Sequence, residues 1–527
     1  MNRRQFLQTA GGALLLGAGC RSLPTATARR KAPFRVLYSN DTTNIVSCIS
    51  PWHKKGEPFR PKMLEASVDE AGGVDAHLLQ PGLGWIPWWK SKVYPADEHY
   101  RWFEKCSGKV PDSFGKYMIA GGDMVRVFID RCRAKGQAPF ISLRMNDAHH
   151  LEVPGSVWIS RFFAGHLDWR IGPDMAKTEQ RVLNWAFPEV RAHKLAIIRE
   201  LCANYDFDGF ELDFMRIYSF FQLDKTTSAQ RRDIMTGFVR DVRAALGPRR
   251  WLCARVPCYL AAYDPLGLDL PALNAVGLDM VNLSASYFTV QQTDLAAIRK
   301  LVPEAAVYLE MCHSTWNGRR PAGAKGYDTF PFRRATPEQM YTAAHLAYAR
   351  GADGVSLFNF VYYREHGGPG RGPFNEPPFH VLPHLGDRAW LARQPQHWFL
   401  ASGWQHPFEK EHVLPRKLAA GQTAAFTLDL APSAGVTRLR VQGESSLDKS
   451  RWRTRLNGVE LAPTSDVSEP YPNPYPPLLG KPDEVRAWLV PAGLLRDGPN
   501  RIEFTLQTGR SAQLAFLDLA ANPVQGS

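Results

Sequence analysis

The stretch "DFDGFELDFMR" (residues 206–216) decides the fold, because its apolar and acidic residues alternate with the period of a β-strand. Phe210, Leu212 and Phe214 share one face of such a strand, and Glu211 and Asp213 share the other. In a closed parallel barrel, one face of each strand meets the surrounding helices and the other points into the barrel. We therefore predict a barrel strand with both carboxylates inside, near the carboxyl end where barrels carry their functional groups.

A structural interpretation of the same two carboxylates stays open. Glu211 and Asp213 would then belong to a buried ion pair, with Arg216 or Arg255 as the partner. Burying two carboxylates is costly unless they are paired or used. The pattern favours a functional use, and the ion pair is the alternative.

Seven further strand-like runs alternate with amphipathic helical runs. The eight strand candidates are residues 34–41, 74–82, 138–147, 207–215, 251–257, 278–288, 306–312 and 353–363. Helical periodicity is clearest at 122–136, 190–205, 230–247 and 337–351. This alternation predicts a (β/α)8 TIM barrel over residues 31–395. A doubly wound fold is disfavoured because no glycine-rich phosphate turn follows the first strand.

In the remaining sequence, residues 396–527, the hydrophobic pattern changes from alternating strand-like and helical runs to strand-like runs alone. Short alternating runs such as "AAFTLDL", "TRLRVQG" and "NRIEFTLQ" are separated by turn signals, and no convincing helix is present. We predict an all-β sandwich, jelly-roll-like in topology, that follows the barrel. It serves either to stabilise the barrel or to bind sugar.

The first 30 residues form a targeting segment and linker that take no part in the fold. "NRRQFLQ" is a twin-arginine export signal, and a short apolar run leads to Cys20 in "LLLGAGC". This stretch resembles a bacterial lipobox, except that Gly17 stands where leucine is usual. We expect export to the periplasm or cell envelope with a lipid anchor on Cys20, or else plain cleavage in "LPTATA".

Composition excludes some classes of function. The net charge is +13, but no long Lys/Arg run accompanies it, so nucleic-acid binding has little support. Apart from Cys20, seven scattered cysteines include no C-x-x-C pair, which predicts neither a zinc site nor a dense disulfide framework. Cys253 and Cys312 lie in strand-like runs and are expected to be small core residues. No cofactor is expected.

Polar residues gather at the carboxyl ends of several predicted strands, which in a barrel converge on one mouth. The candidate substrate-binding residues there are Arg144, Asn146, Asp147, His149, Arg255, Ser284, Tyr287 and Asn359, and Glu310 joins the two carboxylates already named. Either arginine has a plainer interpretation, which is to neutralise Glu211 and Asp213. Trp85 and Trp88, after the second strand, are expected either to stack on sugar rings or to pack under a long loop.

The fourth strand carries a family resemblance. "DGFELDFMR" resembles the "DGIHLDYIR" signature of glycoside-hydrolase-like barrels, the family-10-like lipoproteins and their relatives. Asp208, Gly209, Asp213 and Arg216 match this signature, and Glu211 replaces its histidine. The stretch is also similar to the "DGxDxDxE" strand of family 18 chitinases, but Met215 stands in place of the catalytic glutamate. Substrate-assisted chitinase chemistry is therefore not expected.

We interpret the chain as an exported glycoside hydrolase that acts on a carbohydrate. Such hydrolysis needs one carboxylic acid for the leaving oxygen and a second carboxylate as nucleophile or base. Asp213 is expected to be the nucleophile or base and Glu310 the acid, with the reverse assignment open. Glu211 would tune one of them through its nearby charge.

Two alternatives remain. The chain could be a glycan-binding lipoprotein without a working carboxylate pair. It could also be a metal-dependent hydrolase that uses Asp147, His149 and Glu211, although no second spaced histidine supports a metal site.

Overall fold

The computed structural model describes residues 31–41, 58–83, 85–317, 332–366, 376–401, 413–431, 435–471, 473 and 481–521. The predicted export signal with Cys20, and also Cys48, lie outside these residues. Within them, no helix combines the length and apolar character needed to span a membrane.

Eight parallel strands close into a barrel in the order β1-β10-β7-β6-β5-β4-β3-β2. They are β1 (Val36–Asn40), β2 (Ala76–Leu79), β3 (Ala138–Arg144), β4 (Gly209–Asp213), β5 (Trp251–Pro257), β6 (Met280–Ser284), β7 (Ala306–Cys312) and β10 (Gly354–Phe358). Each lies inside one of the eight predicted runs, so the predicted barrel is confirmed. A hairpin, β8 (Ser314–Asn317) with β9 (Phe332–Arg334), follows β7.

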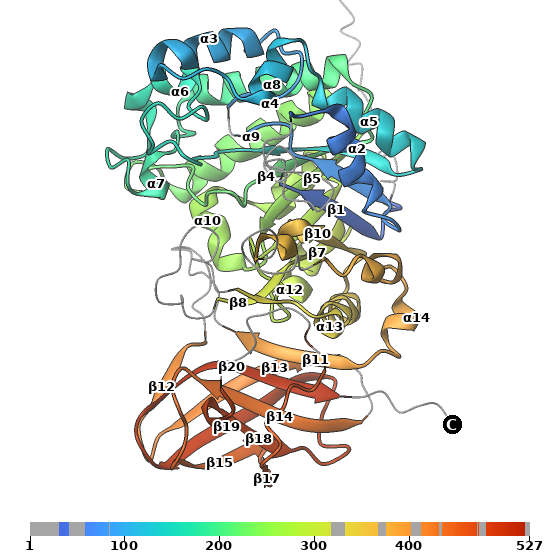
Figure 1. Cartoon of the computed structure of the whole chain (residues 1–527), viewed down its shortest axis with the longest axis vertical. Coiled ribbons are helices and arrows are strands. Elements are labelled where there is room, and N and C mark those ends of the chain that lie inside the picture. The colour runs from blue at the N-terminus through green and yellow to red at the C-terminus, as the bar shows by residue number, and fades with distance from the viewer. Residues whose placement is uncertain are drawn as a thin grey trace, which may run out of the picture.

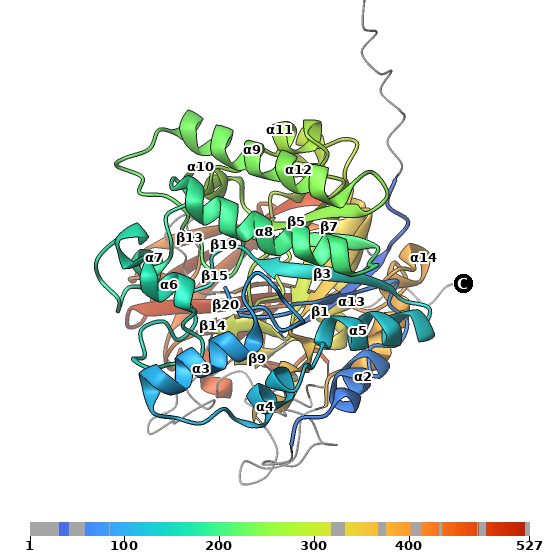
Figure 2. The same ribbon diagram turned by 90° about the horizontal axis from the view of Figure 1, so that it is seen from above.

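Helices surround the barrel. The main ones are α2 (Pro61–Asp69), α3 (Ala96–Ser107), α4 (Ser113–Ile119), α5 (Met124–Ala134), α8 (Pro188–Asn204), α9 (Ser228–Leu246), α11 (Leu270–Ala275), α12 (Leu295–Leu301) and α13 (Pro337–Ala349). Shorter ones are α6 (Arg161–Gly165), α7 (Thr178–Arg181), α10 (Tyr263–Leu266) and α14 (Arg388–Leu391). Seen from above, α8 and α9 lie on one side of the strands and α2 and α5 on the other (Figure 2).

Side-chain capping fixes where two of these helices begin. Thr227 caps α9 and Thr336 caps α13, and each threonine exchanges hydrogen bonds with a glutamine three residues later. This capping box satisfies backbone N–H groups that a helix start leaves unpaired.

The barrel interior divides into an apolar half and a polar half. Its amino end is closed by a cluster that includes Leu37, Phe140, Trp251 and Tyr308. Gly209 makes this closure possible, because a Cβ there would lie 2.0 Å from the Phe140 ring. The polar side chains of the barrel interior therefore lie toward its carboxyl end.

The antiparallel C-terminal domain predicted from the sequence is also confirmed. One sheet has the order β11-β20-β14-β18-β17 and the other β13-β19-β15-β16. The strands are β11 (Gln396–Ala401), β12 (Arg416–Leu418), β13 (Thr423–Leu430), β14 (Val436–Gly443), β15 (Arg451–Leu456), β16 (Val459–Glu460), β17 (Pro463–Thr464), β18 (Val485–Leu489), β19 (Gly498–Thr508) and β20 (Ala512–Ala521). The domain lies below the barrel in Figure 1, with β11 next to α13.

Buried charges connect the two domains. Arg440 of β14 binds Asp518 of β20 through two nitrogens, at 2.9 and 2.5 Å, and also binds Glu469 at 3.1 Å. Arg333 of β9 donates to the same Glu469 at 2.7 Å. His397 completes the group through its Nε2, 2.9 Å from Asp518. Because buried ion pairs need good geometry, this network favours one fixed placement of the sandwich.

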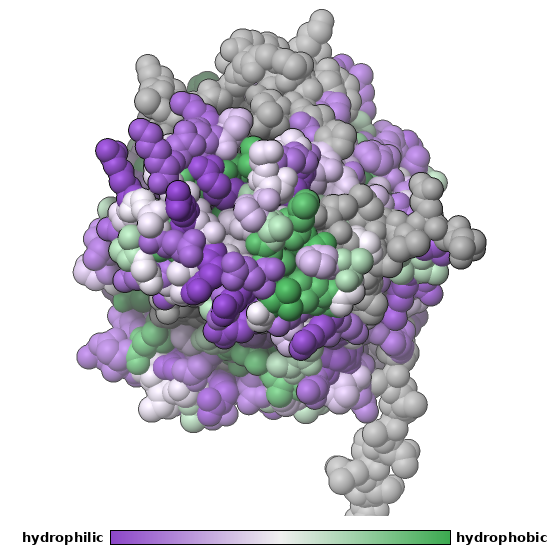
Figure 3. Space-filling model, turned by 90° about the horizontal axis from the view of Figure 1, so that it is seen from below, coloured by the Kyte–Doolittle hydropathy of each residue, from purple (hydrophilic) through white to green (hydrophobic). Residues whose placement is uncertain are grey.

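The free end of the sandwich is mostly hydrophilic, with one compact hydrophobic patch on the face seen from below (Figure 3). In the described strands of the sandwich, two large apolar residues are exposed: Val459 at 47% and Leu489 at 52%. Single exposed apolar residues are common on soluble domains, so these two alone indicate no partner.

Candidate active site

A set of buried polar side chains, here called the inner cluster, occupies the carboxyl half of the barrel. Its members are Ser142, Glu211, Asp213, Arg255, Asn282, Ser284 and Glu310. They converge because the inward positions of neighbouring strands stand in register: Asp213 of β4 pairs with Arg255 of β5, which pairs with Asn282 of β6. The predicted inward direction of the fourth-strand carboxylates is thus confirmed.

Arg255 joins the two carboxylates predicted to be catalytic. Its Nη1 donates to Asp213 at 2.9 Å, and its Nε and Nη2 donate to Glu310 at 2.6 Å each. The Phe358 ring covers the guanidinium at 3.9 Å. The side chains of Asp213 and Glu310 are 0% and 2% exposed. The opposed carboxylates are therefore spaced by one guanidinium group.

Glu310 is saturated with hydrogen bonds. Besides the two from Arg255, it accepts one from the Ser284 hydroxyl at 2.5 Å and one from Asn282 Nδ2 at 3.3 Å. An ionised carboxylate offers about four lone-pair sites, so four donors leave no site for a proton. This geometry is that of a counter-ion for Arg255.

Asp213 is less fully bonded. Its Oδ1 accepts from Arg255 and from the backbone N–H of Met215 at 2.8 Å, and its Oδ2 accepts from Gln80 Nε2 at 3.0 Å. Three donors leave one lone-pair site on Oδ2. Of the two carboxylates on Arg255, Asp213 is therefore the one that retains capacity for a further bond.

Glu211 lies deeper in the barrel and has a different charge state. Ser142 Oγ and Asn282 Nδ2 donate to it at 2.8 and 3.1 Å, and the Cys253 thiol lies 3.6 Å away. Burial raises the pKa of Glu211 to about 7, and the charge of Arg255 only partly opposes this. Glu211 is thus substantially protonated at neutral pH.

A second set of side chains, here called the outer cluster, lies at or beyond the carboxyl ends of the barrel strands. Its members are Asp41, Arg144, Asp147, His149, Arg216 and Tyr287. Arg144 binds Asp41 at 2.7 Å and Asp147 at 2.6 Å. Gln80 links the two clusters, since it accepts from Arg144 and donates to Asp213.

Asp147 and His149 form a dyad within the outer cluster. The Nδ1 of His149 is in direct hydrogen-bond contact with Asp147 Oδ1, and its Nε2 lies 3.0 Å from Arg216 Nη2. Burial alone would raise the pKa of Asp147, but the charges of His149 and Arg144 outweigh it and hold that pKa well below its usual value. Burial, with the charge of Arg216 added, lowers the pKa of His149 against the opposing effect of Asp147.

Two buried donors in this region have no hydrogen-bond partner among the described residues: Arg216 Nε and Asn359 Nδ2. Asn359, at the end of β10, accepts from the backbone N–H of Asp41 through its Oδ1 at 2.7 Å. It adopts a positive φ of 51°, a conformation uncommon outside glycine. Asparagine tolerates this conformation, so it is the unpaired buried donors that mark the region as a candidate site.

Three residues predicted to bind substrate, Asn146, Trp85 and Trp88, are engaged by the protein itself instead. Asn146 donates to the loop carbonyls of Leu183 and Ser219 at 2.8 and 2.7 Å, so its amide group ties two loops together. Trp85 and Trp88 are 3% and 1% exposed, which corresponds to the packing alternative rather than to sugar stacking.

The rings of these two tryptophans contact protein groups. The ammonium of Lys194 lies 3.7 Å from the Trp85 ring and donates to the Arg144 carbonyl at 3.1 Å. Burial lowers the pKa of Lys194 to about 7. The Trp88 ring packs against Phe114 with centroids 4.8 Å apart.

The interpretation that Arg144 and Arg255 only neutralise Glu211 and Asp213 is correct in part. Arg255 does neutralise Asp213, but Arg144 binds Asp41 and Asp147 instead of Glu211 or Asp213. Sequence reasoning missed Asp41 and Gln80 in the site. Both follow the last residue of a barrel strand, so the rule that found Arg144 and Asp213 would also have found them.

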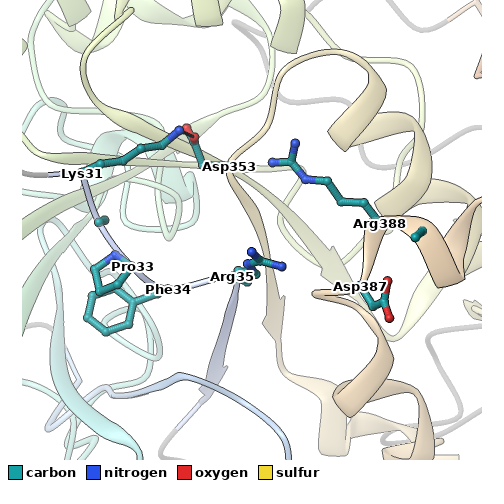
Figure 4. Close-up of a pocket in the computed structure, with 9 residues that line it drawn as sticks. Lys31, Pro33, Phe34, Arg35, Asp353, Asp387 and Arg388 are labelled. Carbon is teal, nitrogen blue, oxygen red and sulfur yellow. Dashed lines mark ion pairs between the residues drawn. The ribbon is translucent and has the colours of Figure 1, made fainter.

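A separate cavity of about 670 Å³ lies at the opposite, amino end of the barrel (Figure 4). Lys31, Arg35, Asp353 and Arg388 line it. Lys31 binds Asp353 at 2.6 Å, and Arg388 donates to the Ala352 carbonyl at 3.0 Å. Active sites of such barrels lie at the carboxyl end, and the charges here are engaged, so we assign this cavity no catalytic role.

Cysteine and metal chemistry add little to the site. None of the six described cysteines forms a disulfide, and Cys253 and Cys312 are buried in the barrel as expected. In the described part of the chain, no group of three or more His, Cys, Asp or Glu side chains is placed to hold a metal ion.

Comparison with known proteins gives similar solved structures only. No protein-family model matches the chain, and no curated protein does. An α-L-fucosidase, isoenzyme 1, from Paenibacillus thiaminolyticus is similar with a TM-score of 0.35 and 14% identity, over 90% of this chain and 97% of that one. A maltogenic α-amylase, AmyB, from Thermotoga neapolitana is similar with a TM-score of 0.35 and 10% identity, over 91% and 98%.

A third solved structure is α-L-fucosidase isoenzyme 2 from Paenibacillus thiaminolyticus, with a TM-score of 0.41 and 11% identity. The match covers 68% of this chain and 49% of that one. At these TM-scores and identities the likeness transfers neither a substrate nor a catalytic residue to this chain.

Proposed function

We propose that this chain is a glycoside hydrolase that cleaves O-glycosidic bonds of an oligo- or polysaccharide at the carboxyl mouth of its barrel. One observation carries the proposal. Carboxylates from several strands converge there with arginines and with unpaired donors, in a barrel whose other end is closed by apolar side chains.

Asp213 is the proposed nucleophile. Arg255 orients one of its oxygens, and the other keeps a free lone pair. A nucleophilic carboxylate on an anomeric carbon splits the hydrolysis into two displacements through a covalent glycosyl-enzyme intermediate. The saturation of Glu310 supports a role in holding Arg255 rather than in donating a proton.

Asp213→Asn tests this assignment. The substitution is nearly isosteric and removes the nucleophile, so we expect turnover to fall by several orders of magnitude while the variant stays folded. Reducing-sugar release across a panel of glycans measures turnover, and thermal unfolding measures stability. Unchanged turnover, or a loss that merely follows a lower melting temperature, would remove Asp213 from the mechanism.

Asp208→Asn is the matched control. Asp208 precedes the same strand at the opposite end of the barrel, where it binds Arg133 at 2.6 and 2.9 Å. Because its side chain is one-third exposed and far along the strand from the mouth, its replacement should leave turnover unchanged.

A glycan-binding protein without turnover is the second candidate. The complete burial of Asp213 and the four hydrogen bonds on Glu310 favour it, since both carboxylates are engaged by the protein itself. In that case calorimetry would detect glycan binding, and no glycan of the panel would be hydrolysed by the unmodified protein.

We also propose that the protein is exported by the twin-arginine route and anchored by a lipid on Cys20. The sequence "NRRQFLQ" and the lipobox-like "LLLGAGC" support this. Replacing Arg3 and Arg4 with lysine should retain the precursor in the cytoplasm, and Cys20→Ala should move the protein from the membrane fraction to the soluble one. A Cys20→Ala variant that stays membrane-bound contradicts the anchor.

A further inference from the structure

We propose that His149 is the proton-transfer residue of the mouth and that Asp147 positions it. The inference rests on the proposed hydrolase function and supplies the acid/base group that the saturated Glu310 does not offer. It adds a catalytic role for His149 to the substrate-binding role expected from the sequence.

The backbone around His149 aims the ring. Asp147 Oδ1 accepts a hydrogen bond from the His149 backbone N–H at 2.8 Å and also contacts the ring nitrogen Nδ1. Its Oδ2 is held by Arg144 at 2.6 Å, so the carboxylate itself cannot turn. The next residue, His150, has a positive φ of 58°, which bends the chain immediately after the dyad. Such strain is retained where the surrounding structure requires it.

Chemistry fixes the tautomer. A guanidinium group only donates, so Arg216 Nη2 at 3.0 Å from Nε2 requires Nε2 to carry the lone pair. The proton is then on Nδ1, directed at Asp147. A carboxylate–imidazole pair in this order leaves Nε2 as the atom that exchanges protons with a ligand.

Arg216 also indicates that Nε2 can be released to a substrate. Its Nη2 carries two hydrogens but has three acceptors in range: His149 Nε2 at 3.0 Å, Tyr287 Oη at 3.1 Å and Asp41 Oδ2 at 3.3 Å. At the same time its buried Nε has no partner in the described part of the chain. A substrate oxygen that accepts from Nε would satisfy that donor. Because Nη2 has fewer hydrogens than acceptors, His149 Nε2 can give up its contact with Nη2 without leaving an Nη2 hydrogen unpaired.

Exposure separates His149 from the other titratable groups. Its side chain is 32% exposed, whereas those of Asp41, Asp147, Asp213 and Glu310 are 3% exposed or less. A catalytic acid or base must contact the reacting oxygen. Tyr287 is also partly exposed, but burial raises the pKa of its phenol, so His149 is the group of the two clusters that is best suited to transfer a proton.

The proposed reaction balances as two displacements. In the first, Asp213 bonds to the anomeric carbon, the glycosidic C–O bond breaks, and the leaving oxygen takes the Nε2 proton of protonated His149. In the second, a water oxygen bonds to that carbon, the Asp213 ester bond breaks, and a water proton moves to His149 Nε2. The histidine thus returns to the protonated form that begins the next cycle.

The groups that face His149 determine its pH dependence. Asp147 and Arg216 contact its ring, Arg144 binds Asp147, and Asp41 and Tyr287 bind Arg216. The His150 ring lies 6.2 Å from the His149 ring between centroids. Burial and Arg216 together lower its pKa from the ordinary 6.5, despite Asp147. Protonated His149 is needed for the first step, so kcat/KM for unactivated glycosides should fall as pH rises through this lowered pKa.

Leaving-group chemistry gives the decisive test. His149→Gln, Asp147→Asn and the control His150→Asn are compared on an oligosaccharide and on the 4-nitrophenyl and 2,4-dinitrophenyl glycosides of the same sugar. Asparagine suits the control because it tolerates a positive φ, and His150 is solvent-exposed.

We expect His149→Gln to lower kcat/KM for the oligosaccharide by about 10²–10⁴-fold, with little effect on the dinitrophenyl glycoside, whose leaving group needs no proton. The fall of kcat/KM with rising pH through the His149 pKa should disappear in this variant. For the dinitrophenyl glycoside, kcat of this variant should be limited by the second step, which has lost its base, and azide, which attacks the intermediate without a base, should raise it. Asp147→Asn should give a smaller loss and move the pH profile to lower pH, because it removes the negative charge beside the ring.

Three outcomes overturn the inference. Full activity in His149→Gln excludes proton transfer by this residue, and an equal loss on all three substrates shows a structural role. In both cases an inactive Asp213→Asn variant leaves the hydrolase proposal standing. If the unmodified protein hydrolyses none of the glycosides, the hydrolase proposal fails, and the inference fails with it.

Discussion

The inner and outer clusters contain the same kinds of side chain, but they differ in how completely those side chains are satisfied. In the inner cluster Arg255 binds two carboxylates, and Glu310 accepts four hydrogen bonds. In the outer cluster one nitrogen of Arg216 is shared among three acceptors while another is unpaired, and His149 is partly exposed. The saturated Glu310 fixes a structure, whereas groups that keep an unpaired atom, such as Asp213 Oδ2 in the inner cluster and Arg216 Nε in the outer one, retain capacity for a ligand.

The comparison teaches that buried charge alone does not identify a catalytic group. Both clusters place carboxylates beside arginines at the carboxyl ends of barrel strands, the feature used to predict catalysis from the sequence. The two clusters are distinguished by how many of the possible hydrogen bonds each of their oxygen and nitrogen atoms makes.

The largest expected effect on stability is that of Arg255→Met. This change leaves Asp213 and Glu310 buried beside each other without a cation, and breaking a buried pair costs about 3–5 kcal/mol. Urea unfolding would show the loss. Arg133→Met at the amino end is the control, because the partly exposed pair with Asp208 contributes about 0–1 kcal/mol. Equal losses in the two variants would contradict a structural inner cluster.

Glu211 should make stability depend on pH. Its pKa is about 7 in the folded protein against an ordinary 4.5, so the folded state binds the extra proton between these values. The contribution is fully present below pH 4.5 and is lost as pH rises to about 7. At about 1.4 kcal/mol per pKa unit this is about 3 kcal/mol at most.

Urea unfolding of the unmodified protein and of Glu211→Gln, between pH 4.5 and 8, measures this effect. The amide cannot ionise, so the variant should lose less stability across the range and should equal or exceed the unmodified protein at pH 8. Parallel curves for the two proteins would show that Glu211 is not the titrating group.

A smaller effect is expected for Glu310→Gln. The amide keeps the shape but removes one charge from Arg255, which still holds Asp213, so about 1–3 kcal/mol of stability should be lost. Turnover of the folded variant should fall much less than in Asp213→Asn. A loss of several orders of magnitude without a change in melting temperature would instead make Glu310 the acid, as the sequence suggested.

The smallest effect is expected from metal removal. Asp147 and His149 are engaged with each other, and Glu211 belongs to the inner cluster, so these three do not share a point where a cation would sit. Dialysis against a chelator should leave turnover and melting temperature unchanged. Loss on chelation, with recovery on added zinc or calcium, would favour a metal-dependent hydrolase.

Much of the fold was predictable from the sequence because strand period and burial are local properties. The alternation of Phe210, Leu212 and Phe214 with Glu211 and Asp213 predicts both faces of β4, and the structure confirms them. Strand ends predicted Arg144 and Arg255 in the site for the same reason.

Pairing was not predictable, because it depends on register between strands and on loops. No local signal shows that Arg144 binds Asp41, more than a hundred residues earlier in the chain, rather than Asp213. Asn146 follows the inward rule of its strand by position, but β3 ends at Arg144, so its amide is free to bind loop carbonyls instead. Trp85 and Trp88 illustrate a further limit of sequence-based prediction. The sequence of a loop does not show whether its aromatic residues face solvent or pack in the core.

The order of strands in the sandwich has a consequence for biosynthesis. β11, the first strand of the domain, is paired with β20, its last, and β20 also pairs with β14. A growing polypeptide cannot complete this sheet until residue 521 has left the ribosome, so the domain must close after translation of all its strands. This order is compatible with the proposed twin-arginine route, which carries cargo that has already folded.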